Sequence, residues 1–96
     1  EGDVIGRIGG EEFAVFLPAT HTRAATALAE RMRELVARHA LRIHGLRVPM
    51  TLSIGVTRLQ PGENTLDAAL RRADAAMYQA KQRGRNRVEV AAVSAP

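Results

Sequence analysis

The chain lacks cysteine and tryptophan, and it contains only three aromatic residues, Phe13, Phe16 and Tyr78. Without cysteine it can form neither a disulfide framework nor a thiolate zinc site, which is consistent with an intracellular setting. No apolar run approaches the roughly 20 residues of a membrane-spanning helix, and no signal peptide opens the sequence. We therefore expect a segment that neither crosses a membrane nor is exported, with a core of aliphatic side chains.

Acidic residues are also the minority: 10 Asp and Glu stand against 14 Lys and Arg, for a net charge of +4. A basic balance is compatible with nucleic acid, a membrane surface or phosphorylated small molecules as partners. Single-stranded nucleic acid needs aromatic side chains on a basic strand face, and the few aromatics make this a poor fit. A small basic nucleic-acid-binding domain would rest on charge alone, since arginines that solvate helix faces account for most of the excess.

The remaining composition, 46% apolar and 25% charged, is that of a folded globular chain, and 96 residues suffice for one domain. Periodicity of two predicts a hairpin from Val4–Ile8 and Glu12–Leu17, and a β-rich stretch over Val48–Val56. Residues 42–47 indicate a strand edge or loop, and Arg87–Val90 a closing strand before a frayed tail. The expected order is ββαβαβ, an α+β fold with an antiparallel-rich sheet flanked by helices.

Two helices are expected from apolar residues at helical spacing. The first runs from Thr22 to about residue 40, with Thr20 or Thr22 as its N-cap. The second begins at Asn64 or Thr65, and its many alanines predict close packing against a sheet. Lys81 lies in its last turn, and Gly84 stands where a helix-ending glycine belongs. The two buried stripes are Ala25, Leu28, Met32, Leu35, Val36 and His39, and then Leu66, Ala69, Leu70, Ala73, Ala76, Met77 and Ala80.

The second hairpin strand is apolar on both faces, because Phe13, Val15 and Leu17 alternate with Ala14 and Phe16. Such a pattern predicts a strand inside a sheet that is covered on both sides. The chain as given supplies no earlier element to cover the second face. We therefore also expect an unpaired sheet edge and exposed apolar surface, and self-association of the isolated segment.

The most informative run is Gly9-Gly10-Glu11-Glu12-Phe13. Paired glycines between two short strands indicate a tight turn, where the main chain can pass close to a ligand. Adjacent carboxylates cannot be buried in a core, so they face solvent, a cation or both. A close backbone beside hard oxygen donors is what a magnesium–nucleotide site requires.

With Arg7-Ile8 before it, this run resembles the signature of the GGDEF domain, the catalytic domain of bacterial diguanylate cyclases, in its GGEEF variant. The resemblance continues in family order through three further blocks and covers Asp3 to about Val90, leaving 91–96 as a tail. It implies a fold akin to the nucleotidyl cyclase palm, of which this chain is the C-terminal portion, with the N-terminal part of the domain absent. The further blocks are residues 29–33, 51–56 and 73–88.

The resemblance also implies an activity. Family members condense two GTP molecules, one on each of two facing domains, to cyclic di-GMP with Mg²⁺ (or Mn²⁺), for second-messenger signalling. This points to GTP and cyclic di-GMP as ligands, catalysis in a homodimer, and neither nucleic acid nor a membrane as a contact of this segment. The domain would be cytoplasmic, in a parent protein that can be membrane-anchored. The alternative is a non-catalytic module that binds GTP or cyclic di-GMP.

Six residues match the family's active site. Glu11 corresponds to a metal ligand and proposed proton acceptor, and Glu12 either assists the metal or acts through backbone contacts. Gly9 and Gly10 let the main chain pass beside the phosphates, although a plain hairpin turn would also explain them. Lys81 and Arg85 correspond to the basic pair that grips the β- and γ-phosphates, while Arg83 and Arg87 are expected to be solvated. Lys81 would also complement the helix dipole, by about 0.3–1 kcal/mol.

Two further residues match an inhibitory site. Asp3 stands where the family's RxxD motif ends, and Arg31 matches a second arginine that can contact cyclic di-GMP. An ordinary surface Asp and a helix-face Arg are the structural alternative. His39 and Tyr78 are expected to pack within the fold. Because the first strand, its metal-binding Asp and the guanine contacts are missing, residues 1–96 alone are expected to be inactive.

Overall fold

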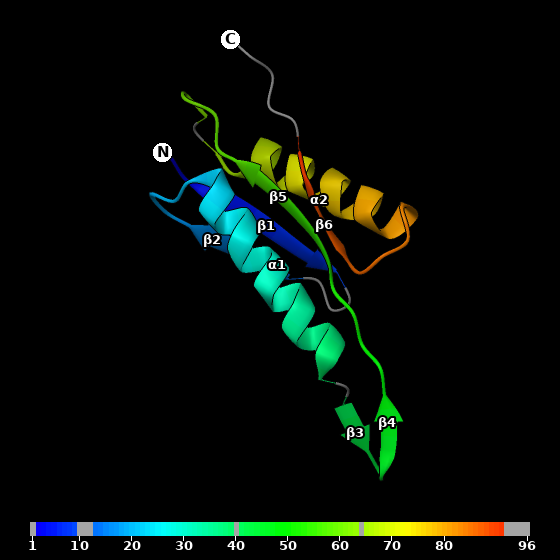
Figure 1. Cartoon of the computed structure of the whole chain (residues 1–96). Coiled ribbons are helices and arrows are strands. Elements are labelled where there is room, and N and C mark those ends of the chain that lie inside the picture. Colours follow the sequence, from blue (N-terminus) through cyan, green and yellow to red (C-terminus); the bar gives the residue numbers. More distant parts are fainter. Residues whose placement is uncertain (1, 10–12, 40, 64, 92–96) are drawn as a thin grey trace.

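A four-stranded sheet in the order β2-β1-β5-β6 organises the chain, and a separate two-stranded ribbon, β3–β4, projects from it (Figure 1). The computed structural model describes residues 2–9, 13–39, 41–63 and 65–91. The elements along the chain are β1 Val4–Gly9, β2 Phe13–Leu17, α1 Thr22–Arg38, β3 Leu41–Ile43, β4 Leu46–Val48, β5 Ser53–Arg58, α2 Asp67–Gln82 and β6 Arg87–Val90.

The sheet is mixed, with antiparallel pairing in the majority. β1 pairs antiparallel with β2 on one side and with β5 on the other, whereas β5 and β6 are parallel. A parallel pair needs a crossover connection, and α2 supplies it. The α+β class and the antiparallel-rich sheet expected from the sequence are confirmed.

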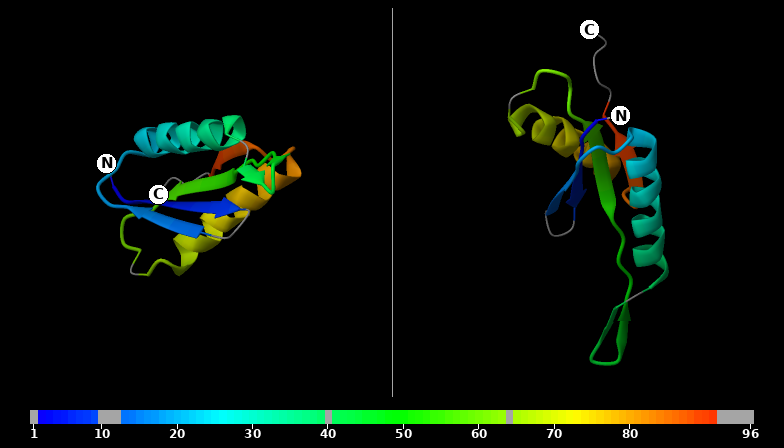
Figure 2. Two further views of the ribbon diagram at one scale, coloured as in Figure 1. Left: turned by 90° about the horizontal axis from the view of Figure 1, so that it is seen from below. Right: turned by 90° about the vertical axis from the view of Figure 1, so that its left-hand side faces the viewer.

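The two helices cover opposite faces of the sheet (Figure 2). Alternation along β1 sends Val4 and Ile8 towards α1, where they pack with Ala25 and Ala29, and sends Ile5 towards α2. Ile5 and Val4 are each 1% exposed. Full burial of such an aliphatic side chain stabilises the fold by about 1.5–3 kcal/mol. Within the described residues, no helix is both long enough and apolar enough to cross a membrane.

The contact between α2 and the sheet is closest at Gly55 in the middle of β5. A Cβ placed on Gly55 would lie 2.1 Å from the carbonyl oxygen of Ala73 and 2.4 Å from the backbone nitrogen of Met77. The helix backbone therefore rests directly on the strand backbone. Small residues make this approach possible, and the close alanine packing expected from the sequence is confirmed by the burial of Ala69, Ala73, Ala76 and Ala80.

The expectation that β2 lies inside the sheet is wrong for this chain. Among the described residues β1 is its one neighbour, so β2 forms the sheet edge. Phe13 is 58% exposed and Phe16 47%, on opposite faces of the strand. The unpaired edge and exposed apolar surface, which the sequence also predicted, are confirmed.

Both expected helix caps are wrong where they can be compared. The residue before α1 is His21, which makes no side-chain capping bond, and the Thr20 hydroxyl donates instead to the Pro18 carbonyl. Leu66 occupies the cap position of α2, also without a side-chain bond, and Asn64 lies outside the described residues. Burial also stops short of the predicted stripes. In α1 the buried residues are Ala25 and Ala29, whereas Leu28, Leu35 and His39 are exposed; Leu66 is exposed as well.

The ribbon β3–β4 corrects the predicted element order. The β-rich stretch 48–56 is divided, since Val48 ends β4 and β5 begins at Ser53. His44 and Gly45 connect β3 and β4 with positive φ angles of 50° and 79°. Left-handed residues at both central positions are typical of a tight hairpin turn.

A buried threonine and an ion pair fasten the connection between β5 and α2. Arg72 donates to both carboxylate oxygens of Glu63, at 2.8 and 2.9 Å, and to the hydroxyl of Thr57, which is fully buried. The hydrogen bonds that Glu63 accepts from Arg72, and the one it accepts from the Gln60 backbone N–H, lower the pKa of Glu63 from 4.5 to about 2. The carboxylate is therefore ionised over the whole neutral and mildly acidic range.

We predict that Gly55→Ala lowers the free energy of unfolding by about 3 kcal/mol, because the new methyl group meets backbone atoms that cannot move aside. Gly6→Ala on the neighbouring strand is the matched control. The nearest atom to its Cβ lies at 3.9 Å, an ordinary contact, so a change within about 1 kcal/mol is expected. Urea denaturation of the full-length protein measures both, and equal effects would contradict the close approach at Gly55.

We also predict a pH-dependent effect of Glu63→Gln. Because the pKa of Glu63 is lowered from 4.5 to about 2, its stabilising contribution is complete above pH 4.5 and is lost as the pH falls towards 2. The variant should be less stable than the wild type at pH 7, and the difference should shrink at pH 3. Glu34→Gln on the exposed side of α1 is the control. A difference that is the same at both pH values would refute the prediction.

Candidate functional site

The expected site lies at the end of the sheet where β1 finishes. Gly9 is the last residue of β1 and pairs with Ser53 at the start of β5. On the other side Ile8 pairs with Phe13, so the connection between these two strands comprises Gly9 and residues 10–12. Gly10, Glu11 and Glu12 lie outside the described residues, and their predicted roles remain predictions.

Lys81 lies directly against Gly9. A Cβ placed on Gly9 would lie 2.7 Å from Cε of Lys81, 3.2 Å from its Nζ and 3.1 Å from Sδ of Met77. Gly9 does not have a positive φ angle, so its backbone conformation is open to other residues. Glycine is favoured here because it leaves room for the lysine side chain. The sequence argument from turn geometry did not identify this contact.

An ion pair two residues earlier on β1, on the same face of the strand, also joins β1 to this helix. Nε of Arg7 lies 3.1 Å from Oδ1 of Asp74. Asp74 and Lys81 are seven residues apart on α2, about two helical turns, and therefore lie on one side of the helix. The exposed pair contributes at most about 1 kcal/mol to stability. Its main effect is on the position of α2 along β1. The sequence spacing of Arg7 and Asp74 gave no indication of this pair.

The second predicted phosphate ligand, Arg85, follows the end of α2. Gly84 has a φ of 117°, and the Arg85 N–H donates to the Ala80 carbonyl at 2.9 Å. This six-to-one bond is that of a Schellman motif, so Gly84 ends the helix as predicted. Arg85 and Asn86 also have positive φ angles, 62° and 49°. The chain therefore reverses sharply at residues 84–86, just after the end of α2.

The side chain of Asn86 helps to hold this reversal in place. Its Oδ1 accepts a hydrogen bond of 2.9 Å from Arg33 of α1, which is also paired with Glu30 at 2.7 Å. The bond joins α1 to the turn that carries Arg85, across the sheet from α2. Nothing in the spacing of Arg33 and Asn86 predicted this link, because it depends on how the two helices lie on the sheet.

Arg83 and Arg87 are exposed, as the sequence predicted, but each also forms an ion pair. Arg83 lies 2.9 Å from one carboxylate oxygen of Glu89, and Arg87 lies 3.1 Å from the other. Glu89 thus uses both oxygens on neighbouring arginines. Lys81 and Arg85 take no part in this cluster. This is consistent with the expectation that Lys81 and Arg85, but not Arg83 and Arg87, bind phosphates.

The candidate inhibitory residues do not meet one another. Oδ1 of Asp3 accepts a hydrogen bond of 2.8 Å from the backbone N–H of Ala19, whose φ of 50° is positive. Asp3 therefore secures the turn between β2 and α1. Arg31 is exposed on α1. Tyr78, which was expected to pack within the fold, is 61% exposed.

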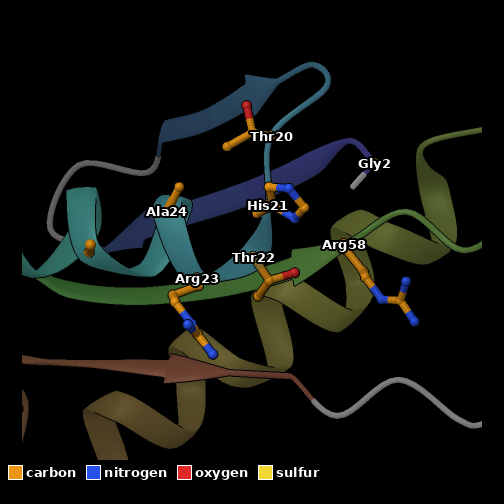
Figure 3. Close-up of a pocket in the computed structure, with 8 residues that line it drawn as sticks. Gly2, Thr20, His21, Thr22, Arg23, Ala24 and Arg58 are labelled. Atoms are coloured by element: carbon orange, nitrogen blue, oxygen red, sulfur yellow. The ribbon is translucent and has the colours of Figure 1, made fainter.

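A cavity of about 710 Å³ lies elsewhere, at the start of α1 (Figure 3). Gly2, before β1, and Arg58, the last residue of β5, are among the residues that line it. Because Val4 pairs with Arg58 and Gly9 with Ser53, this cavity is at the opposite end of the sheet from Lys81. Within the part of the chain that the structure describes, no cluster of three His, Asp or Glu side chains could hold a metal ion.

Comparison with known proteins identifies relatives of this arrangement. Residues 1–87 match the family described as "Diguanylate cyclase, GGDEF domain". Diguanylate cyclase DgcP of Pseudomonas aeruginosa is 43% identical over 91 residues, which are 95% of this chain and 13% of that protein. Diguanylate cyclase A of Treponema denticola is 39% identical over 94 residues, 98% of this chain and 25% of that protein.

Solved structures show the same fold. The GGDEF domain of DgcB from Caulobacter crescentus, solved with c-di-GMP, is 34% identical with a TM-score of 0.79 over 88% of this chain and 49% of that one. The active GGEEF domain of a Vibrio cholerae diguanylate cyclase is 36% identical with a TM-score of 0.76, over 98% and 59%. The chain thus spans about half to three fifths of these solved chains, and a quarter or less of the two curated relatives.

We predict that the contact of Gly9 with Lys81 can be measured as a coupling. Gly9→Ala should lower the free energy of unfolding by about 1 kcal/mol, since the closest atoms belong to a flexible side chain. In a Lys81→Ala background the same substitution should cost about 0.5 kcal/mol less. In an Arg71→Ala background, an exposed position on α2, the costs should add. Additivity in both backgrounds would show that Gly9 and Lys81 do not touch.

Proposed function

This chain belongs to the GGDEF family of diguanylate cyclase domains, and from that premise we propose that the protein containing it condenses two GTP molecules to cyclic di-GMP. In this reaction the ribose 3′-hydroxyl of each GTP attacks the α-phosphate of the other, and two pyrophosphates leave. The chain covers only part of its relatives, so the proposal concerns the full-length protein. The relatives named diguanylate cyclases, at 39–43% identity over nearly the whole chain, support it.

The contact between Lys81 and Gly9 is the observation that carries the proposal. It brings a cation to the end of β1, two residues before Glu11 in the sequence. Triphosphate recognition needs positive charge, and Lys81 supports the proposal because it supplies that charge at this end of the sheet. A hairpin tip remote from the end of α2 would have contradicted this reading.

We assign roles to the chain's own residues as follows. Glu11 accepts the proton of the attacking 3′-hydroxyl, and the backbone at Gly9 and Gly10 lies along the phosphates. Lys81 and Arg85 bind the β- and γ-phosphates and so hold the α-phosphate in line for attack. The turn after α2, with Asn86 bonded to Arg33, would fix the backbone from which Arg85 extends.

Magnesium (or manganese) is the cofactor that this chemistry implies. Glu11 would hold it, with Glu12 as a further candidate, because hard carboxylate oxygens suit Mg²⁺ and the ion accepts few protein ligands when phosphates supply the rest. When bound, the ion would offset the negative charge of the phosphates.

The remaining expectations belong to the same proposal. Two facing domains are needed because each binds one GTP, so catalysis takes place in a homodimer. The domain acts in the cytoplasm. Asp3 and Arg31 remain the candidates for an inhibitory cyclic di-GMP site. The competing function is a module that binds GTP or cyclic di-GMP without turnover. The two functions differ in whether the part of the domain that the solved relatives have and this chain does not cover supplies the remaining catalytic groups.

We predict that Glu11→Ala in the full-length protein lowers the rate of cyclic di-GMP formation by at least about 10²-fold, the cost of losing a group that stabilises the transition state. Lys81→Ala should act mainly on KM for GTP. Arg71→Ala, which removes an exposed charge from the same helix, should change neither value. Product formation from GTP and Mg²⁺, followed by chromatography, measures all three.

Two results would overturn the assignment. If the wild-type protein binds GTP but forms no product, the binding module is the correct function. If Glu11→Ala and Lys81→Ala both retain wild-type kinetics, the site is elsewhere. Residues 1–96 alone serve as the negative arm of the same assay, since they lack the guanine contacts and the first strand.

A further inference from the structure

The ribbon β3–β4 stands apart from the rest of the molecule. It projects beyond the end of α1, and its strands pair with each other and not with the four-stranded sheet (Figure 1). Its described residues Arg42 to Arg47 are all exposed. An isolated two-stranded ribbon is marginally stable in water, and its outer edges carry unpaired backbone N–H and C=O groups. The ribbon therefore offers pairing groups that the domain itself does not use.

One face of the ribbon carries an uncompensated pair of cations. Arg42 of β3 is the cross-strand partner of Arg47 of β4. Like charges directly opposite each other destabilise a pair of strands. No Asp or Glu occurs from Leu35 to Gly62, although Arg38, Arg42, Arg47 and Arg58 lie in that segment. The pair therefore lacks a local counter-charge in the sequence and favours an anionic partner.

The other face is apolar. Ile43 and Leu46 form the next cross-strand pair, and because side chains alternate along a strand they point away from the arginines. They are 50% and 70% exposed. A groove of about 420 Å³ lies beside the base of the ribbon, lined by Leu35, Val36, His39 and Met50. Exposed apolar side chains are therefore found both on the ribbon and at the end of α1.

We propose that an edge of this ribbon binds an extended, acidic segment of a partner protein as a third strand. A strand added to the edge alternates between the same two faces, so its acidic residues would lie against Arg42 and Arg47 and its aliphatic residues beside Ile43 and Leu46. The partner is thus a segment in which carboxylates and aliphatic side chains alternate. This surface shares no residue with the site at Gly9 and Lys81.

A protein segment fits these features better than other anions do. Nucleic acid would leave the exposed aliphatic pair without a contact, and the ribbon has no Phe, Tyr or Trp for base stacking. An anionic membrane would use the arginines but not the unpaired edge or the groove. The ribbon combines an unpaired edge, one cationic and one apolar face, and an apolar groove beside its base. An extended peptide in which acidic and aliphatic side chains alternate matches all three features.

The test uses the full-length protein and a fluorescein-labelled synthetic peptide of alternating Glu and Val. A peptide with the same composition, but with Glu and Val in separate blocks, is its control. Anisotropy should show at least tenfold tighter binding of the alternating peptide. The double variant Arg42→Glu/Arg47→Glu should weaken its binding at least tenfold. Arg23→Glu/Arg71→Glu, with the same change of charge at exposed positions elsewhere, should not.

Hydrogen exchange tests the binding mode without a variant. The alternating peptide should protect backbone amides within 41–48 of the wild-type protein, and Ile43→Ser/Leu46→Ser should reduce that protection. Equal affinity for the two peptides, or no protection in 41–48, would refute the proposal. Arginine-dependent binding to phosphatidylserine vesicles or duplex DNA, with no binding of the alternating peptide, would also refute it.

Discussion

The contact between the backbones of α2 and β5 at Gly55 is the constraint on which the candidate site depends. The absence of a side chain there lets the helix lie on the strand, and buried alanines keep it close along its length. Once the helix is held at this distance, Asp74 meets Arg7 and the Lys81 side chain occupies the space left by Gly9. Any displacement of α2 at Gly55 would move the cation at its other end.

The end of α2 shows how a helix terminus can serve two purposes. Gly84 allows the Arg85 N–H to donate to the Ala80 carbonyl, one of the last of the helix. It also reverses the chain between Lys81 and Arg85. Asn86 then ties this turn to α1 through Arg33. Two helices on opposite faces of one sheet therefore determine the position of a single short turn, which explains why three successive residues with positive φ are tolerated there.

The strands of the sheet differ in how far they are enclosed by the rest of this chain. β1 and β5 are paired on both sides and buried, whereas β2 has a free edge and exposes Phe13 and Phe16. Exposed aromatic side chains on both faces of a strand are costly in water, so β2 presents the apolar surface that the sequence predicted.

Local patterns in the sequence were enough for the α+β class, both helices, the Gly84 helix end and the alanine face of α2, because each depends on periodicity or on the backbone of one residue. They were not enough for the helix caps, the β3–β4 ribbon or the edge position of β2, which tertiary packing decided. The sequence predicted Lys81 as a site residue through a family resemblance. Only the fold showed that Lys81 occupies the space beside Gly9, since residues 72 positions apart in the chain meet there through the packing of α2 on the sheet.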